Sequence, residues 1–289
     1  MSVRRLEHIP GFHIDRVAAA AGDDPEVLRL ENLDTDIAPP EAAMAATRAA
    51  IGEDEANSWL PFTGRDDLKE AVAAYIERRG GPRYDGRWEI VITCGEGDAM
   101  LDALFCLTDP GDEVLLTDPT YAGMLNRVRL VGAVPRLVPL QVGDGAWRLD
   151  LDALAAAVTE RTRVVFLNNA SFPSGWVATE EEWEAVASIC RGRDTWLLYW
   201  AGFEGVLFDG RPIRHPAALP GMRDRTVIVG APSLEQRMIA WRVGWVVAPG
   251  ELVNDVARVQ IYNGLVPSGF AQIGTRVALS LTDDHLVAA

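Results

Sequence analysis

The chain has 289 residues, 48% of them apolar, which is enough for one large domain or for one large and one small domain. Its net charge of −15 argues against a surface for nucleic acid or an anionic membrane, because phosphate groups would be repelled. The spacing of the three cysteines matches no zinc site or redox pair. No apolar stretch reaches 18 residues without a charged residue, so the sequence predicts no membrane-spanning helix. Because the N-terminus also lacks a signal-peptide pattern, we expect a cytoplasmic protein without a membrane span.

Helices and strands alternate along the chain. Amphipathic patterns predict helices over residues 39–54, 64–80, 95–108, 120–132 and 180–193. Short apolar runs predict buried strands over residues 88–93, 112–119, 133–140, 163–169, 195–200, 226–230 and 242–249. This alternation is typical of βαβ units, so the sequence predicts an α/β fold with a mostly parallel sheet.

The stretch TCGEGDAM (93–100) follows a predicted strand and opens a helix. Its glycines would let a phosphate approach the N–H groups of the helix start. An ordinary strand-to-helix turn is the alternative, because the stretch is neither a P-loop nor a full dinucleotide fingerprint. Glu96 and Asp98 suit the helix dipole but would compete with a phosphate.

Three aromatic residues follow other predicted strands, where α/β proteins bind ligands. Tyr121 in DPTYAG could stack on a planar ligand or pack in the core. Trp200 and Phe203 in LLYWAGFEG are typical of a core or a lined pocket, not of acid/base chemistry. The four histidines have no metal-ligand spacing and no neighbouring nucleophile, so we interpret them as surface or capping residues and expect no metal site.

Six stretches in order resemble the fold type I pyridoxal phosphate (PLP) enzymes, in particular the class I/II aminotransferases. They are NSWLPFTGRDDLKEAVAAYI, TCGEGDAM, TDPTYAG, NNASFPSG, LLYWAGFEG and APSLEQRMIAWRVGW. The resemblance covers residues 30–285. It implies an aspartate aminotransferase-like large domain with a mostly parallel seven-stranded sheet between helices, and a homodimer with its site at the interface.

The resemblance also shows which residues depart from the family pattern. Leu234 stands where the family has its Schiff-base lysine, and Trp200 where it has the aspartate that pairs with the pyridine nitrogen. Phe172 and Phe203 replace an asparagine and a tyrosine that hydrogen-bond the cofactor's phenolic oxygen, and Trp59 falls near a tyrosine that reaches the partner's phosphate. The family features that remain are Tyr121, Arg242, the Gly95/Gly97 turn and the Pro173-Ser174-Gly175 turn.

These departures predict a pocket that has lost covalent PLP chemistry. A PLP enzyme needs an amine to hold the aldehyde and a carboxylate to keep the ring nitrogen protonated, and leucine and tryptophan supply neither. The chain's single lysine, Lys69, lies in a charged run that we interpret as surface. We therefore expect no catalytic residue and no covalent cofactor. We expect the pocket to be apolar, and either filled by the protein's own side chains or open to an apolar ligand.

If PLP or another phosphate-bearing ligand binds noncovalently, the resemblance implies a particular set of contacts. They are Gly95, Glu96 and Gly97 backbone groups, Ser233 and Arg242, with Tyr121 stacking and Phe172, Trp200 and Phe203 around the ring.

The chain divides in three on this interpretation: residues 1–50 as an N-terminal arm and first helix, 51–250 as the large α/β domain, and 251–289 as the start of a C-terminal region. Family members run on into a small domain whose arginine grips the substrate carboxylate. We expect that domain to be largely absent here, because the chain is a fragment or because the clamp has been lost.

Three hypotheses for function stay open. The first is a non-catalytic or repurposed relative that binds an apolar or amino-acid-like small molecule or acts as a dimer partner. The second is an aminotransferase or arginine-processing enzyme of amino-acid metabolism or biosynthesis with impaired or noncovalent PLP use. The third is PLP-independent chemistry, for which no Ser-His-Asp, Cys-His or carboxylate pair is found. A deliberately altered version of such an enzyme would also explain the sequence.

Overall fold

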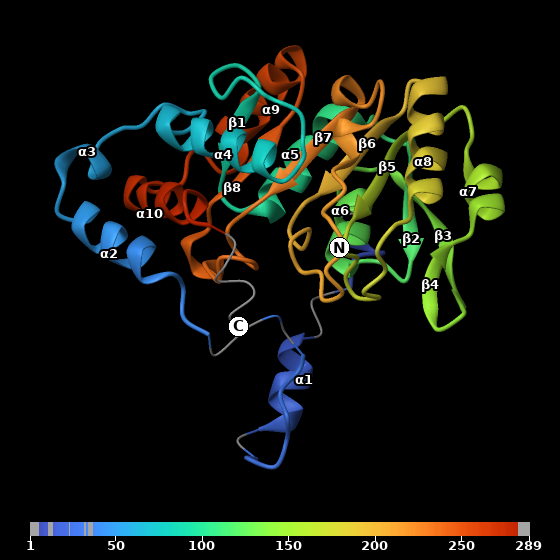
Figure 1. The fold of residues 1–289 in the computed structure, drawn as a ribbon, viewed down its shortest axis with the longest axis horizontal. Coiled ribbons are helices and arrows are strands. Elements are labelled where there is room, and N and C mark those ends of the chain that lie inside the picture. The colour runs from blue at the N-terminus through green and yellow to red at the C-terminus, as the bar shows by residue number, and fades with distance from the viewer. Residues whose placement is uncertain (1–5, 11–13, 23, 32, 34–36, 283–289) are drawn as a thin grey trace.

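A computed structural model describes residues 6–10, 14–22, 24–31, 33 and 37–282. A central sheet lies between two layers of helices (Figure 1). The order of its eight strands is β1-β8-β7-β6-β5-β2-β3-β4. The strands are β1 (Ile90–Thr93), β2 (Glu113–Asp118), β3 (Val134–Gly143), β4 (Ala146–Leu149), β5 (Thr162–Asn168), β6 (Trp196–Trp200), β7 (Thr226–Gly230) and β8 (Gly244–Val247).

The sheet is mostly parallel, as predicted. The pairs β3–β2, β2–β5, β5–β6 and β6–β7 are parallel, whereas β8 runs antiparallel between β7 and β1. The eighth strand, β4, was not expected. It pairs antiparallel with β3 across a two-residue turn of Asp144 and Gly145, which both have positive φ (51° and 76°). Asp-Gly is a strong hairpin signal, so the sequence did carry this information.

The helices are α1 (Ile14–Ala21), α2 (Glu41–Ala50), α3 (Asp54–Asn57), α4 (Asp66–Arg78), α5 (Glu96–Leu107), α6 (Ala122–Leu130), α7 (Leu151–Ala157), α8 (Glu180–Gly192), α9 (Gly250–Asn263) and α10 (Gly269–Leu279). Short 3₁₀ turns are η2 (Pro216–Ala218), η3 (Arg223–Arg225) and η4 (Ile239–Trp241).

Side chains that alternate between the two faces of the sheet form two separate hydrophobic cores. In β6, Leu197 and Tyr199 face a core shared with α4 and α8, whereas Leu198 and Trp200 face a core shared with α5, α6 and α9. Successive side chains of a strand point to opposite faces, so one strand serves both layers. We call the first the α4 core and the second the α5 core. The site lies at the edge of the α5 core.

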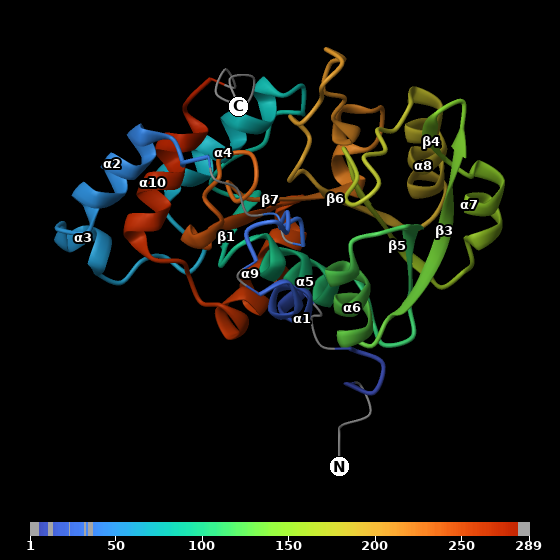
Figure 2. The same cartoon turned by 90° about the horizontal axis from the view of Figure 1, so that it is seen from below.

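Helix α10 lies against α2 and α4 at one end of the sheet, as Figure 2 shows. Gln272 of α10, fully buried, accepts a hydrogen bond from the Arg65 amide at 2.9 Å and donates one to the Pro267 carbonyl at 2.7 Å. These bonds fix the start of α4 to α10. The division of the chain at residues 50 and 250 stays a prediction.

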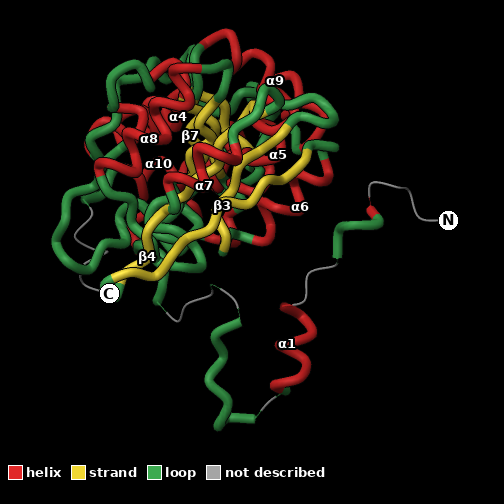
Figure 3. Tube along the Cα trace, turned by 90° about the vertical axis from the view of Figure 1, so that its right-hand side faces the viewer, coloured by secondary structure: helices red, strands yellow, loops and turns green. Residues whose placement is uncertain are grey.

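Helix α1 stands apart from the body of the molecule (Figure 3), and none of its residues is buried. Within the described ranges no helix is both long enough and apolar enough to cross a membrane. Of the three cysteines, Cys190 is buried and Cys94 and Cys106 are half-buried.

Candidate functional site

The predicted site residues gather at the carboxyl ends of the parallel strands. Tyr121 follows β2, Phe172 follows β5, Trp200 ends β6 with Phe203 three residues on, and Leu234 follows β7. All five contribute to the α5 core. Parallel strands bring their carboxyl ends to one edge of a sheet, so residues far apart in sequence meet there.

Four of these residues form an aromatic cluster around Trp200. The ring centroids of Trp200 and Tyr121 are 5.2 Å apart, and those of Trp200 and Phe203 are 5.4 Å apart. Phe172 stacks on Phe203 at 6.0 Å and meets Tyr121 edge-on at 6.1 Å. Trp200 is 2% exposed, and the other three rings are half-buried around it. Tyr121 therefore packs on an indole of this chain.

The indole N–H of Trp200 has a specific partner. Its Nε1 donates to Oε2 of Glu96 at 2.9 Å. The indole lies directly over Gly202, where an added Cβ would be 2.4 Å from Nε1. Burial raises the pKa of the Glu96 carboxyl, while the indole N–H and the guanidinium groups of Arg242 and Arg127 act in the opposite direction.

The start of α5 is enclosed by backbone and arginine side chains. Gly95 is the N-cap with φ +98°, a conformation that favours glycine, and an added Cβ would be 2.4 Å from the Arg242 guanidinium. Gly244 lies equally close to the Gly95–Glu96 peptide, since a Cβ there would be 2.5 Å from the Gly95 carbonyl carbon. Arg242 and Gly244, the two ends of the Arg-x-Gly motif, therefore both lie against the start of α5. Arg242 does so through its guanidinium and Gly244 through its backbone.

Sequence reasoning missed Arg127 of α6. Its Nε donates to the Gly97 carbonyl at 2.9 Å, and its Nη1 donates to the Gly123 carbonyl at 3.0 Å. This arginine ties α6 to the start of α5 and adds positive charge beside Glu96. The sequence carries no local signal for this contact, because Gly97 and Arg127 are 30 positions apart and only the packing of α6 against α5 brings them together.

The loop after β7 carries Ser233 and Leu234. Leu234 is half-buried and packs against the α5 core. Ser233 is 3% exposed, and its hydroxyl has no hydrogen-bond partner in the described part of the chain. A cleft of about 410 Å³ lies beside Phe172 and Phe203 and is otherwise lined largely by the apolar residues of the two following loops.

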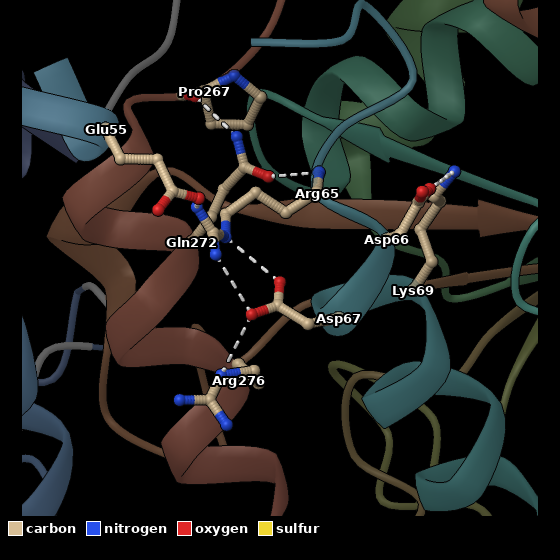
Figure 4. Close-up of polar contacts among 8 residues, drawn as sticks. All are labelled: Glu55, Arg65, Asp66, Asp67, Lys69, Pro267, Gln272 and Arg276. Carbon is tan, nitrogen blue, oxygen red and sulfur yellow. Dashed lines mark hydrogen bonds and ion pairs between the residues drawn. The ribbon is translucent and has the colours of Figure 1, made fainter. Parts of the chain in front are cut away.

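Two predicted positions do not join this cluster. Trp59 is 79% exposed and contacts Phe62 edge-on at 5.5 Å. The interpretation of Lys69 as a surface residue is wrong, because it is 2% exposed on the inner side of α4. Its Nζ lies 2.7 Å from Asp66 and 3.5 Å from the Thr63 hydroxyl, and Figure 4 shows Lys69 and Asp66 side by side. Its amine is committed to these partners.

Among the residues that the structure describes, no group of three or more His, Cys, Asp or Glu side chains is arranged to hold a metal ion. His215 is buried, and its Nδ1 accepts a hydrogen bond from the Ala217 amide at the start of η2. This is a capping role, one of the two roles expected for the histidines.

The chain is similar to several aminotransferases. It is 32% identical over 238 residues to arginine–pyruvate transaminase of Pseudomonas aeruginosa, which covers 82% of this chain and 59% of that protein. It is 33% identical over 252 residues to a probable N-succinyldiaminopimelate aminotransferase of Mycobacterium tuberculosis, covering 87% of this chain and 62% of that one. The chain therefore spans about three fifths of the length of these curated relatives.

Solved structures agree with the sequence comparison. N-succinyldiaminopimelate aminotransferase from Mycobacterium tuberculosis superposes with a TM-score of 0.92 at 28% identity, covering 100% of this chain and 74% of that one. Aspartate aminotransferase from Rhizobium meliloti superposes with a TM-score of 0.92 at 30% identity, covering 100% and 73%. The family model for aminotransferase class I and II matches residues 26–286. The chain belongs to the class I and II aminotransferase family.

Proposed function

We propose that this chain is a non-catalytic member of the family, with a cofactor pocket occupied by its own side chains and without covalent PLP. The observation that carries the proposal is the buried indole of Trp200, which contacts Tyr121 on one side and hydrogen-bonds Glu96 at the start of α5. The family resemblance places the cofactor ring beside that tyrosine. An indole held there competes with the ring for space.

The residues present do not fit PLP, for three reasons. Leu234 offers no amine, and the single lysine of the chain is paired with Asp66. Trp200 offers no carboxylate to a ring nitrogen. Glu96 places a carboxyl at the helix start where a phosphate would need the N–H groups.

The same features support a small-molecule-binding role in place of catalysis. The cleft beside Phe172 and Phe203 has largely apolar walls, with Asp209 and Arg211 also in its lining, and a volume of about 410 Å³, within the range of small-molecule sites. This part of the proposal is tested by the binding of a neutral aromatic probe such as indole, which should be weakened by Phe172→Ala.

A second candidate function is an amino-acid-modifying enzyme that uses PLP noncovalently. Arg242 and Arg127 at the start of α5, and the buried Ser233 hydroxyl without a partner in the described chain, favour it. So does the similarity to arginine–pyruvate transaminase. A transamination of that kind would be part of amino-acid metabolism or biosynthesis.

The first experiment is to add PLP to the purified chain, scan its visible absorbance, reduce it with borohydride and measure the intact mass. We expect neither an imine band nor a mass gain. Because Lys69 and the α-amino group are the primary amines of the chain, peptide mapping of the reduced protein locates any adduct, and an adduct on Lys69 would overturn the proposal. A bound but unreduced cofactor would support the second candidate.

Two variants separate a missing amine from a filled pocket. Leu234→Lys restores the amine alone, whereas Leu234→Lys with Trp200→Asp also removes the indole. We expect no imine in the first variant and an imine in the second. Equal imine formation in both would mean that Trp200 does not occupy the cofactor's space.

The homodimer and the cytoplasmic location remain part of this proposal. Light scattering on the purified chain tests the first, and fractionation of the source cell tests the second.

A further inference from the structure

A buried cluster of charged side chains lies on the other side of the sheet from the aromatic pocket. It consists of Arg79 after α4, Glu204 after β6 and Glu235 after β7, which are 4%, 1% and 5% exposed. Nη1 of Arg79 lies 2.5 Å from Oε2 of Glu235 and 3.5 Å from Oε1 of Glu204.

The two carboxyl groups have unequal partners. Glu235 also accepts hydrogen bonds from the Tyr75 hydroxyl at 2.9 Å and from the Gly205 amide at 2.6 Å. Glu204 accepts one from the Tyr199 hydroxyl at 3.2 Å. Two ionised carboxylates beside one guanidinium would leave a buried negative charge, which is costly. The carboxyl with the weaker partners is therefore the one that holds a proton.

Neighbouring groups agree with this assignment. Burial, reinforced by the charge of Glu235 and opposed by Arg79, raises the pKa of Glu204 to about 8. Burial raises the pKa values of Tyr75 and Tyr199 well above 10, so both stay neutral. His215, whose ring is 5.4 Å from that of Tyr199, has its pKa lowered by burial to about 4. Glu204 is the member of this set that changes charge between pH 7 and 9.

The cluster is joined directly to the pocket through the chain. Phe203 and Leu234 pack against the α5 core, whereas the next residues, Glu204 and Glu235, contact tyrosines of the α4 core. The bond from the Gly205 amide to Glu235 also links the loop after β6 to the loop after β7. A charge change in the cluster therefore acts on two loops that carry pocket side chains.

We propose that Arg79, Glu204 and Glu235 form a proton-operated latch, in which loss of the proton from Glu204 loosens both loops and opens the pocket wall at Phe203 and Leu234. The latch concerns access to the pocket, so it goes beyond the proposed function. It requires neither the presence nor the absence of PLP.

Hydrogen exchange with mass spectrometry on the full chain tests the latch, using peptides that span residues 201–206 and 231–237. Rates are corrected for base catalysis against a peptide from α8. Between pH 6 and 8 we expect protection of both peptides to fall, by up to about tenfold per pH unit, and to level off above pH 8, because the opened loops release the Glu204 proton that the closed loops hold up to a pKa of about 8. Glu204→Gln should abolish this fall.

Asp102→Asn is the matched control, because Asp102 is a second buried carboxyl, with its pKa raised by burial to about 7. This variant should keep the response of the unaltered chain. The latch is wrong if Glu204→Gln keeps the response, or if neither loop peptide responds to pH.

A second measurement serves if Glu204→Gln fails to fold. Carbon-13 NMR of the unaltered chain with labelled glutamate should show one side-chain carboxyl that titrates between pH 7 and 9, and its absence would overturn the latch. Neither assay contains PLP, so failure of the latch leaves the proposal about the cofactor standing. An imine formed with PLP would likewise leave the latch untouched.

Discussion

Nε1 of Trp200 lies 2.9 Å from Oε2 of Glu96, so a strand of the sheet and the start of α5 are joined by an indole–carboxylate hydrogen bond. Both residues stand in the pocket, where the family resemblance implies contacts to the cofactor ring and phosphate. Because the N–H group stabilises the ionised carboxyl, this bond opposes the effect of burial on the pKa of Glu96. The pocket therefore has an internal polar contact of its own.

Replacing Trp200 with Phe should lower the free energy of unfolding at pH 7 by about 2 kcal/mol, because a half-buried carboxylate loses a charge-assisted donor. The pKa of Glu96 should rise further. Urea unfolding measures the first effect, and the pH dependence of unfolding measures the second. Glu96→Gln and the double variant complete a cycle, and additive effects would mean that the two groups do not interact.

Gly202→Ala should also destabilise the chain, by about 2 kcal/mol, because its Cβ would be 2.4 Å from Nε1 of Trp200 and would displace the indole. Gly192→Ala is the control, since a Cβ there meets nothing within 4 Å. The penalty at Gly202 should shrink when Trp200 is Phe. A penalty that persists in that background would assign it to the backbone, not to the indole.

The sequence predicted the fold well because the strands of the parallel sheet are continuous apolar runs. It missed β4, whose four residues include the exposed Arg148 and make a weak strand pattern beside an Asp-Gly turn. It located the pocket residues through the spacing of the six motifs. It could not show that Trp200 bends over Gly202 to reach Glu96, because that contact depends on side-chain packing between separate elements.

Charged residues within buried segments were the harder class to predict. Lys69 lies in the run RDDLKE, which looks solvent-exposed, yet its place on the inner side of α4 buries it beside Asp66. Arg79 and Glu235 are 156 positions apart in the numbering, and only the packing of α4 against the loop after β7 brings them together. Local patterns hold no information on such pairs.

The stability of the chain should depend on His215 at acid pH. Burial lowers its pKa from 6.5 to about 4, so its contribution is fully present above pH 6.5 and is lost as the pH falls towards 4. The stability difference between the unaltered chain and His215→Gln should therefore change with pH in that window. The exposed His8 provides the control variant His8→Gln. Parallel stability curves for the chain and His215→Gln would contradict the assignment.

Glu235→Gln and Glu204→Gln should differ in stability although both remove one buried carboxyl beside Arg79. At pH 7 we expect Glu235→Gln to cost about 3 kcal/mol, because it breaks the closer ion pair. Glu204→Gln should instead leave the chain equally stable or more stable, because an amide needs no proton, whereas Glu204 has to take one up when the chain folds at pH 7.

The effect of Glu204→Gln on the free energy of unfolding depends on pH. The raised pKa of Glu204 means that its stabilising contribution is present below the unfolded value near 4.5 and is lost as the pH rises through about 8. Glu204→Gln should therefore be more stable than the unaltered chain at pH 9. Glu184→Gln, which alters an exposed ion pair with Arg191, should change stability little at either pH. Equal costs for the two buried variants at pH 7 would mean that both carboxylates are ionised beside Arg79.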